Sequence, residues 1–252
     1  MYYIGTDLGG SKIAAGAVDE NFNIISKYKM QTRADKPAEC IAEDIVAAAM
    51  TAIKNGGLDI KDCAGMGIGA PGSVDRKNGI VTNAWNLGWK NVELKKLVES
   101  KIKVKCEVAN DADCAAYAET LCGSAIGYKN VILATIGTGF GGGFVINGEI
   151  YSGSGYSSTE PGHIVLVLDG EQCTCGRKGC IEAYASMTAL KKQGKRAAEN
   201  DPSSKLNNYE KLTGRIILDE AEAGDETAAA VSNKFKEYVG ASITDLVNCF
   251  DP

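Results

Sequence analysis

The chain has 252 residues, of which 44% are hydrophobic and 23% are charged, and its formal net charge is −5. This composition is typical of a globular protein with one large core or two medium ones, and the acidic balance disfavours partners such as nucleic acid or an acidic membrane surface. The start of the chain lacks the basic and apolar regions of a signal peptide, and its longest apolar runs are too short to span a bilayer. We therefore expect a cytoplasmic protein that binds neither nucleic acid nor membrane.

The first pattern in the chain is a glycine-rich turn between two β-type runs, "IGTDLGGSKIAAGAVDE" at residues 4–20. A similar stretch, "IGTGFGGGFVINGE", covers residues 136–149, and we match its pair Gly137–Thr138 with Gly5–Thr6. The similarity indicates an internal repeat and two halves of like construction. Glycine-rich turns between strands let backbone N–H groups approach phosphate oxygens closely, although two ordinary glycine-rich hairpins would give the same pattern.

The later stretch also matches the pattern G-x-G-x-x-G through Gly137, Gly139 and Gly142. A dinucleotide-binding loop of this kind should open a helix, whereas residues 141–150 are expected to continue as a strand and a turn. Neither stretch contains the G-K-[ST] sequence of a P-loop. The pattern therefore disfavours both of these nucleotide-binding folds.

Between the two stretches the chain alternates between helical and extended patterns, which predicts an α/β fold. Helices are expected at residues 38–53, 91–102 and 111–121, and strands at residues 64–74, 104–109 and 130–136. The C-terminal part is expected to be helical at residues 181–196 and again from about 217 to 249. We predict a small N-terminal α/β domain of residues 1–118 and a larger α/β domain of residues 119–252.

Asn110 and Asp111 stand where the strand at 104–109 meets the following helix. The simplest interpretation is that they cap the helix N-terminus, because Asn and Asp are favoured there. A carboxylate at the end of a strand is also well placed to reach a cleft. The two interpretations are compatible.

The only histidine of the chain, His163, lies in the same stretch as Cys173, Cys175 and Cys180. Thiolates and imidazole are the ligands that zinc prefers, and three cysteines with one histidine complete a tetrahedral structural site. A disulfide would leave one cysteine over and is disfavoured in the cytosol, and a chance cluster among nine cysteines stays open as well. The other six cysteines are expected to be reduced and mostly buried thiols.

Taken together, the motifs resemble those of the ROK family of sugar kinases and repressors, within the actin-like and hexokinase-like ATPases. The matching segments are "DLGGSK" (7–12), "GIGAPGSVD" (67–75), "NLGW" (86–89), "NDA" (110–112), "IGTGFGGG" (136–143), "EPGHI" (160–164) and "CTCGRKGCIEAYAS" (173–186). The first and fifth resemble the two phosphate loops of the family. The last is highly specific, and all the matches run in the same order along the chain.

The resemblance implies two ribonuclease-H-like domains around a cleft. It also implies ATP-dependent phosphorylation of a hexose hydroxyl, with glucose as the first candidate substrate and N-acetylmannosamine, N-acetylglucosamine, fructose and mannose as alternative candidates. The implied cofactors are ATP, magnesium and a structural zinc ion, and the implied assembly is a homodimer.

The resemblance also implies roles for individual residues. Glu160 and Glu182 would bind sugar hydroxyls, Asn110 would position the sugar, and Asp111 would be the general base. His163 would give one ring nitrogen to zinc and the other to the sugar. The sugar-binding set is Gly72, Asn86, Asn110, Asp111, Glu160, His163 and Glu182; the ATP-binding set is Asp7, Gly9, Gly10, Ser11, Lys12, Gly137, Thr138 and Gly139; the metal set is His163, Cys173, Cys175 and Cys180.

The chain departs from the family pattern at Ala109, Asp113 and Thr159, where glutamate, asparagine and glycine are common, and these positions bear on sugar specificity. The resemblance stops at "NCFDP" (248–252), so we expect the family's C-terminal segment, which flanks the adenine, to be absent and nucleotide binding to be weak. Family repressors carry a helix-turn-helix domain before the first phosphate loop, which here begins at residue 4. We therefore favour a kinase over the alternative, a non-catalytic sugar-binding regulatory protein.

Overall fold

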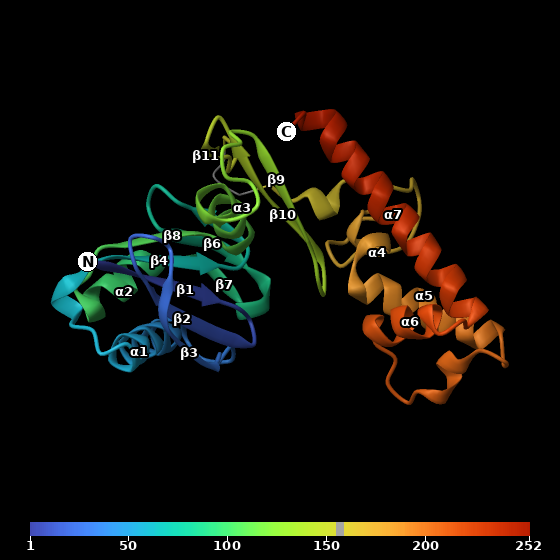
Figure 1. The fold of residues 1–252 in the computed structure, drawn as a ribbon, viewed down its shortest axis with the longest axis horizontal. Helices are drawn as coiled ribbons and strands as arrows, with labels where there is room; N and C mark the ends of the chain where they lie inside the picture. The colour runs from blue at the N-terminus through green and yellow to red at the C-terminus, as the bar shows by residue number, and fades with distance from the viewer. Residues whose placement is uncertain (155–158) are drawn as a thin grey trace. The chain divides into compact units, whose positions relative to one another are not determined.

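The computed structural model describes residues 1–154 and 159–252, and its helices and strands confirm the α/β class (Figure 1). Two compact units are found, Met1–Val131 with Gly143–Thr159 and Ile132–Gly142 with Glu160–Pro252. The boundary expected after residue 118 lies inside helix α3 (Asp111–Cys122) and does not coincide with the limits of these units. The division into two domains at that residue stays a prediction.

The first unit is built on a five-stranded sheet with the strand order β3-β2-β1-β4-β8. Its strands are β1 (Tyr2–Leu8), β2 (Lys12–Val18), β3 (Ile24–Gln31), β4 (Cys63–Ala70) and β8 (Cys106–Asn110). The pairs β1–β2 and β2–β3 are antiparallel, while β1–β4 and β4–β8 are parallel. Since the carboxyl ends of parallel strands meet at one edge of a sheet, the segments that follow β1, β4 and β8 lie at the same edge.

Helix α1 (Ala38–Asn55) packs against β2 and β3 and covers one face of this sheet (Figure 1). Ile41, Ile45 and Ala49 follow the three-to-four-residue spacing of a helix, and all three are fully buried. The many alanines of this helix keep its buried face flat, so the helix can approach the sheet closely. The helix expected at residues 38–53 is therefore confirmed.

The remaining elements of the first unit come before and after β8 in the sequence. They are η1 (Ile60–Asp62), β5 (Ser73–Asp75), β6 (Ile80–Ala84), η2 (Trp85–Leu87), β7 (Trp89–Val92), α2 (Leu94–Ile102) and α3. Strands β5, β6 and β7 form a second sheet in that order. The helix expected at residues 91–102 begins only at Leu94, because the residues just before it pair with β6 as a strand.

Strands β9 (Val131–Ile136), β10 (Phe140–Ile146) and β11 (Glu149–Ile150) form a third sheet in the order β11-β10-β9. Three residues join β9 to β10, and three residues join β1 to β2. We call these connections the first glycine loop (Gly9–Ser11) and the second glycine loop (Gly137–Gly139). The expected strand and turn after the second loop are confirmed.

The match between Gly5–Thr6 and Gly137–Thr138 is wrong in its register. Gly5 and Thr6 lie inside β1, paired with Gly16 and Ala15 of β2, because that hairpin continues for two more residue pairs before it turns. In the second hairpin the N–H of Gly137 donates to the carbonyl oxygen of Gly139 (3.0 Å) and closes the turn at once. The glycine loops therefore correspond to each other, but the Gly-Thr pairs do not.

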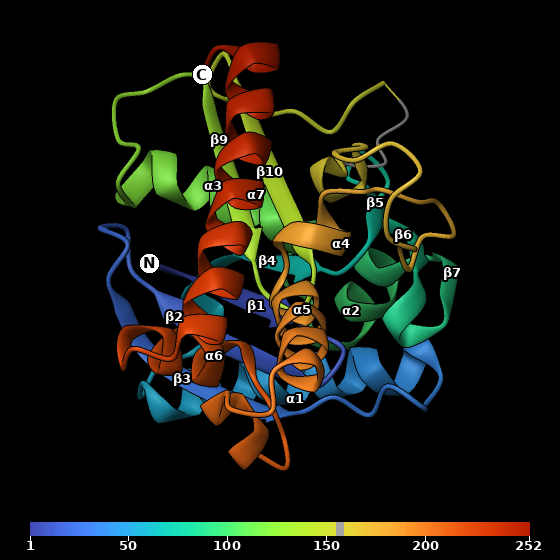
Figure 2. The ribbon, with the colours of Figure 1, turned by 90° about the vertical axis from the view of Figure 1, so that its right-hand side faces the viewer.

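The second unit is mainly helical. Its elements after the second glycine loop are η3 (Pro161–His163), α4 (Glu182–Ala185), α5 (Met187–Asn200), η4 (Lys205–Asn208), α6 (Gly214–Glu222) and α7 (Glu226–Phe250). Figure 2 shows α7 running alongside α5 and α6, and the three helices bury Leu190, Ile217 and Phe235 between them.

Two helices that were expected to be continuous are broken. The stretch at 181–196 divides at Ser186, whose side chain accepts from the N–H of Ala189 (3.1 Å) and starts a new helix. The stretch from 217 divides at Gly224, where a left-handed φ of 88° ends α6 and Asp225 caps α7. Both breaks follow from preferences of single residues for helix ends.

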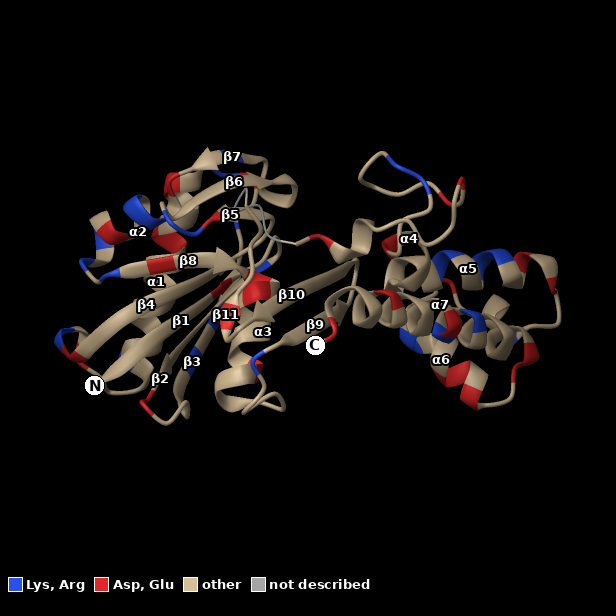
Figure 3. Cartoon of the chain, turned by 90° about the horizontal axis from the view of Figure 1, so that it is seen from above, with Lys and Arg blue, Asp and Glu red and all other residues tan. Residues whose placement is uncertain are grey.

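The six cysteines outside the His163 cluster are free thiols, as expected, but only Cys106 among them is buried. The expectation that most are buried is wrong, since Cys122 and Cys249 lie exposed near the ends of α3 and α7. Within the described residues, no helix is long and apolar enough to cross a membrane. Figure 3 shows basic residues gathered along α5, namely Lys191, Lys192, Lys195 and Arg196.

Candidate functional site

The first glycine loop is held by a threonine that the sequence did not single out. The Oγ1 of Thr32 donates to the carbonyl oxygen of Gly9 (2.7 Å), and its N–H donates to that of Ser11 (3.1 Å). Gly10 lies against Asn86, because a Cβ atom at Gly10 would come within 2.9 Å of the Asn86 Nδ2. The structure therefore brings a residue of the expected sugar-binding set next to the expected phosphate loop.

Asn110 is both a helix cap and a link to the loop that follows β4. Its Oδ1 accepts from the N–H groups of Ala112 (2.8 Å) and Asp113 (3.1 Å), and its Nδ2 donates to the carbonyl oxygen of Gly72 (2.9 Å). The capping interpretation is confirmed for Asn110, whereas Asp111 is the first residue of the helix. Since an amide nitrogen carries two protons, one N–H of this 8% exposed side chain is left for a ligand.

Asp111 begins helix α3, and its side chain is exposed. Desolvation by the surrounding protein raises the pKa of its carboxyl group, the Asp7 carboxylate adds to the rise, and the N–H of Ala112 (2.8 Å) opposes it. A carboxylate that reaches solvent and binds protons more readily than usual is suited to accept a proton from a bound hydroxyl. Asp7 lies exposed near the end of β1 in the same unit.

The second glycine loop is held along its whole length by one short segment, residues 182–188. The N–H of Met187 donates to the carbonyl oxygen of Gly137 (2.9 Å), and the Oγ1 of Thr188 donates to that of Thr138 (2.6 Å). The N–H of Phe140 donates to the Oε2 of Glu182 (3.2 Å). The carbonyl oxygens of Gly137 and Thr138 are therefore turned toward this segment.

Glu182 connects the second glycine loop with the loop that carries the cysteines, residues 173–180, which we call the cysteine loop. While its Oε2 accepts from Phe140, its Oε1 accepts from the Oγ1 of Thr174 (2.9 Å). The carboxylate also fills the space beside Gly139, where a Cβ atom would collide with it. A side chain at position 139 would therefore have to displace the end of the Glu182 side chain.

The four residues of the expected metal set come together in the structure. One ligand atom from each of His163, Cys173, Cys175 and Cys180 lies within 4.8 Å of every other. The Nδ1 of His163 is 3.7 Å from the Sγ of Cys173, and the Sγ atoms of Cys175 and Cys180 are also 3.7 Å apart. This pair is therefore not joined by a disulfide in the structure, because the sulfur atoms of a disulfide are about 2.05 Å apart.

These distances fit a tetrahedral zinc ion. With Zn–S bonds of about 2.3 Å and Zn–N bonds of about 2.0–2.1 Å, two sulfur ligands would be roughly 3.8 Å apart and a nitrogen and a sulfur roughly 3.6 Å apart. Because the His163 Nδ1 lies close to Cys173, it would be the nitrogen that faces a metal bound here, and Nε2 would be left for another partner. The fourth ligand fills the set, so a metal held here would have no open position.

The backbone of the cysteine loop is folded back on itself at two glycines. Gly176 (φ 88°) and Gly179 (φ 79°) adopt the left-handed conformation, and the N–H of Cys173 donates to the carbonyl oxygen of Arg177 (2.8 Å). Glu160 lies just before η3, where its carbonyl oxygen accepts from the N–H of His163 (3.1 Å). Both expected sugar-binding carboxylates therefore flank the metal set within the second unit.

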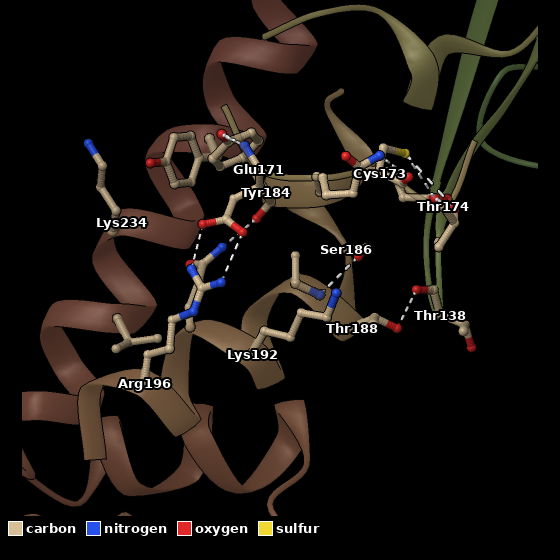
Figure 4. Close-up of a pocket in the computed structure, with 18 of the residues that line it drawn as sticks. Thr138, Glu171, Cys173, Thr174, Tyr184, Ser186, Thr188, Lys192, Arg196 and Lys234 are labelled. Carbon is tan, nitrogen blue, oxygen red and sulfur yellow. Dashed lines mark hydrogen bonds and ion pairs between the residues drawn. The ribbon is translucent and has the colours of Figure 1, made fainter. Parts of the chain in front are cut away.

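A cavity of about 730 Å³ opens beside the second glycine loop, inside the second unit (Figure 4). Thr138, Gly139 and Glu182 line it on one side, and helices α5 and α7 line it on the other. Of its cationic residues, Arg196 pairs with Glu171 through two contacts, and Lys234 pairs with Glu237. Figure 4 shows Lys192 extending from α5 toward Thr188.

The expected site residues thus form two groups, one in each unit. The first group is Asp7, Gly9, Gly10, Ser11, Lys12, Gly72, Asn86, Asn110 and Asp111, and the second is Gly137, Thr138, Gly139, Glu160, His163, Cys173, Cys175, Cys180 and Glu182. Sequence reasoning missed Thr32, Thr174 and Thr188, which hold the loops. The only signal for the last two was their place inside or next to a recognised motif.

Comparison with known proteins gives a consistent result. A family model described as the ROK family matches residues 3–252. The glucokinase of Streptomyces coelicolor is 36% identical over 256 residues, which cover 99% of this chain and 78% of that protein. The xylose repressor of Bacillus spizizenii is 30% identical over 253 residues, which cover 100% of this chain and 62% of that protein.

Among solved structures, the ROK family glucokinase from Streptomyces griseus in complex with glucose and AMPPNP matches with a TM-score of 0.83 and 37% sequence identity. The match covers 100% of this chain and 81% of that chain. The chain is therefore shorter than its relatives, and it is similar both to proteins named as kinases and to one named as a repressor.

Proposed function

The chain belongs to the ROK family, and we propose that it is an ATP-dependent sugar kinase that phosphorylates a hexose hydroxyl, with glucose as the first substrate. The likeness to the glucokinases of two Streptomyces species supports this proposal. N-acetylmannosamine, N-acetylglucosamine, fructose and mannose are the further substrates to be tested. We also propose a cytoplasmic location and a homodimer.

The observation that carries the proposal is the position of Glu182. One of its oxygens binds the second glycine loop at Phe140, and the other binds the cysteine loop at Thr174. A sugar kinase must hold a sugar close to the phosphoryl group that it receives. A single carboxylate that touches both the expected phosphate loop and the expected sugar-binding segment meets this requirement.

For the sugar, we propose Glu160, Glu182 and the Nε2 of His163 as hydrogen-bonding partners in the second unit. Asn110 contributes its remaining N–H, and Gly72 and Asn86 complete the set in the first unit. Carboxylates accept from neighbouring sugar hydroxyls, while an imidazole whose other nitrogen is fixed has a defined orientation.

For the reaction, we propose Asp111 as the general base. The sugar hydroxyl oxygen attacks the γ-phosphorus of ATP, its proton passes to the Asp111 carboxylate, and ADP leaves. Most of the catalysis of phosphoryl transfer comes from positioning and charge neutralisation, and the base adds a factor of about 10²–10⁴. The raised pKa of Asp111 supports this role.

For ATP and magnesium, we propose the two glycine loops together with Asp7, Ser11 and Lys12. Backbone N–H groups of glycine loops bind phosphate oxygens, and a carboxylate such as Asp7 is a suitable magnesium ligand. In the second unit the cavity beside Thr138 has room for part of the nucleotide, and Lys192 brings positive charge to it.

For the cysteine loop, we propose a structural zinc ion held by His163, Cys173, Cys175 and Cys180. When bound, the ion supplies no chemistry to the reaction, because a complete set of four protein ligands leaves no position for water or substrate. The role of the loop is to hold the side chain of His163 and the neighbouring carboxylates of Glu160 and Glu182 in place.

The proposal is tested by ADP formation from magnesium ATP with each of the five sugars and without sugar. We expect sugar-dependent ADP formation that is strongest with one hexose and at least about 10²-fold slower in an Asp111→Asn variant. If no sugar raises ADP formation above the sugar-free rate, the chain is not a sugar kinase of this kind.

The second candidate is a sugar-binding regulatory protein without catalysis, which the likeness to a xylose repressor favours. Calorimetry distinguishes the two. Binding of a sugar without any ADP formation would favour the regulator, whereas turnover of the bound sugar would favour the kinase.

A further inference from the structure

The carboxylate of Glu182 is held at both of its oxygens by parts of the second unit that are distant in the sequence. Phe140, which lies 42 residues before it, donates its N–H to Oε2, and Thr174, which lies eight residues before it, donates its hydroxyl to Oε1. Of the two donors, Thr174 is the one that belongs to the cysteine loop, and it is exposed. A carboxylate held at both ends has one orientation.

Glu182 still has capacity for a ligand in this orientation. An ionised carboxylate offers about four acceptor positions, and the hydrogen bonds from Phe140 and Thr174 use two of them. The Sγ of Cys173 lies 3.8 Å from Oε1 and would not donate once it is a metal ligand. Two positions therefore remain for two sugar hydroxyls, and their directions are set by the two donors already bound.

We propose that Thr174 is a positioning residue whose hydroxyl holds Glu182 on the second glycine loop and thereby couples the affinities for sugar and nucleotide. This inference rests on the proposed function, because it takes Glu182 as a sugar ligand and the second glycine loop as a phosphate loop. Without the Thr174 hydroxyl, Glu182 loses the contact that fixes its Oε1 and can rotate away from Phe140. The loop then loses one of its supports from residues 182–188.

Coupling follows from the shared carboxylate. A sugar that binds Glu182 stabilises the orientation in which Oε2 accepts from Phe140, and this orders the loop for the nucleotide. Because linkage is reciprocal, bound nucleotide must raise sugar affinity by the same factor. The metal alone cannot provide this link, since none of its ligands contacts the second glycine loop through an observed hydrogen bond of the described residues.

The test compares Thr174→Val, which removes the hydroxyl and keeps the branched shape, with Thr174→Ser, which keeps the hydroxyl. Thr244→Val is the matched control, because Thr244 also donates its hydroxyl, to the carbonyl oxygen of Gly240 (2.9 Å), on the exposed surface of α7. Zinc content is measured for every variant and is expected to be the same as in the wild type. This excludes loss of the cysteine loop as the cause of any change.

The first readout is hydrogen exchange of the peptide that covers residues 137–140 in the zinc-loaded protein without substrates. We expect exchange at this peptide to be about tenfold faster in Thr174→Val, since hydrogen bonds to charged groups contribute appreciably to stability. Thr174→Ser and Thr244→Val are expected to exchange like the wild type. Unchanged exchange in Thr174→Val would overturn the positioning role.

The second readout is the affinity for glucose, measured by calorimetry with and without a non-hydrolysable ATP analogue. In the wild type we expect the analogue to strengthen glucose binding at least about fivefold, a factor typical of coupled sites. Thr174→Val should lose most of this factor and show a higher KM for glucose with kcat within about twofold, and Thr174→Ser should restore both. Equal coupling in wild type and Thr174→Val would refute the inference.

The two proposals fail in different ways. If the wild type forms no ADP with any sugar, the proposed function is wrong, and the coupling falls with it. If the wild type is an active kinase while Thr174→Val has the exchange, coupling and KM of the wild type, only the inference about Thr174 is wrong.

Discussion

Replacement of Gly72 by alanine tests whether the turn after β4 is built as the structure shows. Gly72 has a left-handed φ of 79°, and a Cβ atom there would run into the backbone carbonyl oxygen of Asn83. The carbonyl oxygen of Gly72 itself accepts from the Nδ2 of Asn110 (2.9 Å). Gly57 provides a matched control, because it has a similar φ of 64° but no atom within 4 Å of the position of a Cβ.

The size of the effect follows from these two environments. The left-handed conformation costs an L-residue roughly 1–2 kcal/mol, and the reduced freedom of the unfolded chain offsets about 0.4–1 kcal/mol of it in a Gly→Ala change. Gly57→Ala should therefore lower the free energy of unfolding by about 1 kcal/mol. Gly72→Ala must in addition displace the backbone at Asn83, and overpacking of this kind costs typically about 1–3 kcal/mol more.

The two variants are compared by urea unfolding. Where the free energy of unfolding depends on urea concentration with the same slope, a shift in the midpoint reports a change in stability. We expect Gly72→Ala to be less stable than Gly57→Ala by about 1–3 kcal/mol. We also expect a higher KM for the sugar in Gly72→Ala alone, because the carbonyl oxygen that accepts from the Nδ2 of Asn110 moves. Equal stability of the two variants would show that the backbone of Asn83 does not lie against Gly72, and the reasoning would be refuted.

Four further predictions concern the remaining parts of the site. Asp111→Asn should lower kcat by a factor of about 10² or more with little change in sugar affinity, and near-normal turnover would exclude Asp111 as the base. The base acts when it is deprotonated, and the pKa of Asp111 is raised mainly by desolvation and further by Asp7, so activity should fall as the pH drops through a value above the usual range of aspartate. Asp7→Asn should move this acid limb of the pH profile to lower pH. A limb that does not move would show that Asp7 does not affect the pKa of Asp111. Cys175→Ala should lower the zinc content and raise the KM for the sugar. The control Cys249→Ala, at an exposed cysteine at the end of α7, should change neither. Full activity without zinc would contradict the proposed role of the cysteine loop. Gly139→Val should raise the KM values for both ATP and sugar, because the added side chain displaces Glu182, and an effect on ATP alone would show that Glu182 does not lie against Gly139.

The parts of the fold that depend on local patterns could be predicted from the sequence. Helix α1 follows from the spacing of Ile41 and Ile45, and the N-terminal cap of α3 follows from Asn110. The clustering of the expected metal set could be predicted because its four residues lie within 18 residues of one another and include the only histidine of the chain. In each case the residues that interact are close in the sequence.

The parts that depend on distant contacts could not be predicted in the same way. The register of the two hairpins is decided by how far β1 pairs with β2, and the sequence similarity of the Gly-Thr pairs pointed to the wrong residues. Thr32 holds the first glycine loop from the end of the third strand, 23 residues after Gly9. A threonine in such a position is indistinguishable in the sequence from any other threonine at a strand end.

Glu182 illustrates how a recognised motif can understate the role of a residue. From the sequence it is a carboxylate two residues after a metal ligand, and its expected task is to bind a sugar. In the structure its Oε2 also lies where a Cβ atom of residue 139 would be, and it accepts from the N–H of Phe140. Two physical reasons therefore favour a glycine at position 139: Glu182 lies close to it, and the proposed phosphate would approach its backbone closely. Because a Cβ atom at Gly139 would meet Glu182, a substitution there should disturb the proposed sugar ligand as well as the proposed phosphate loop.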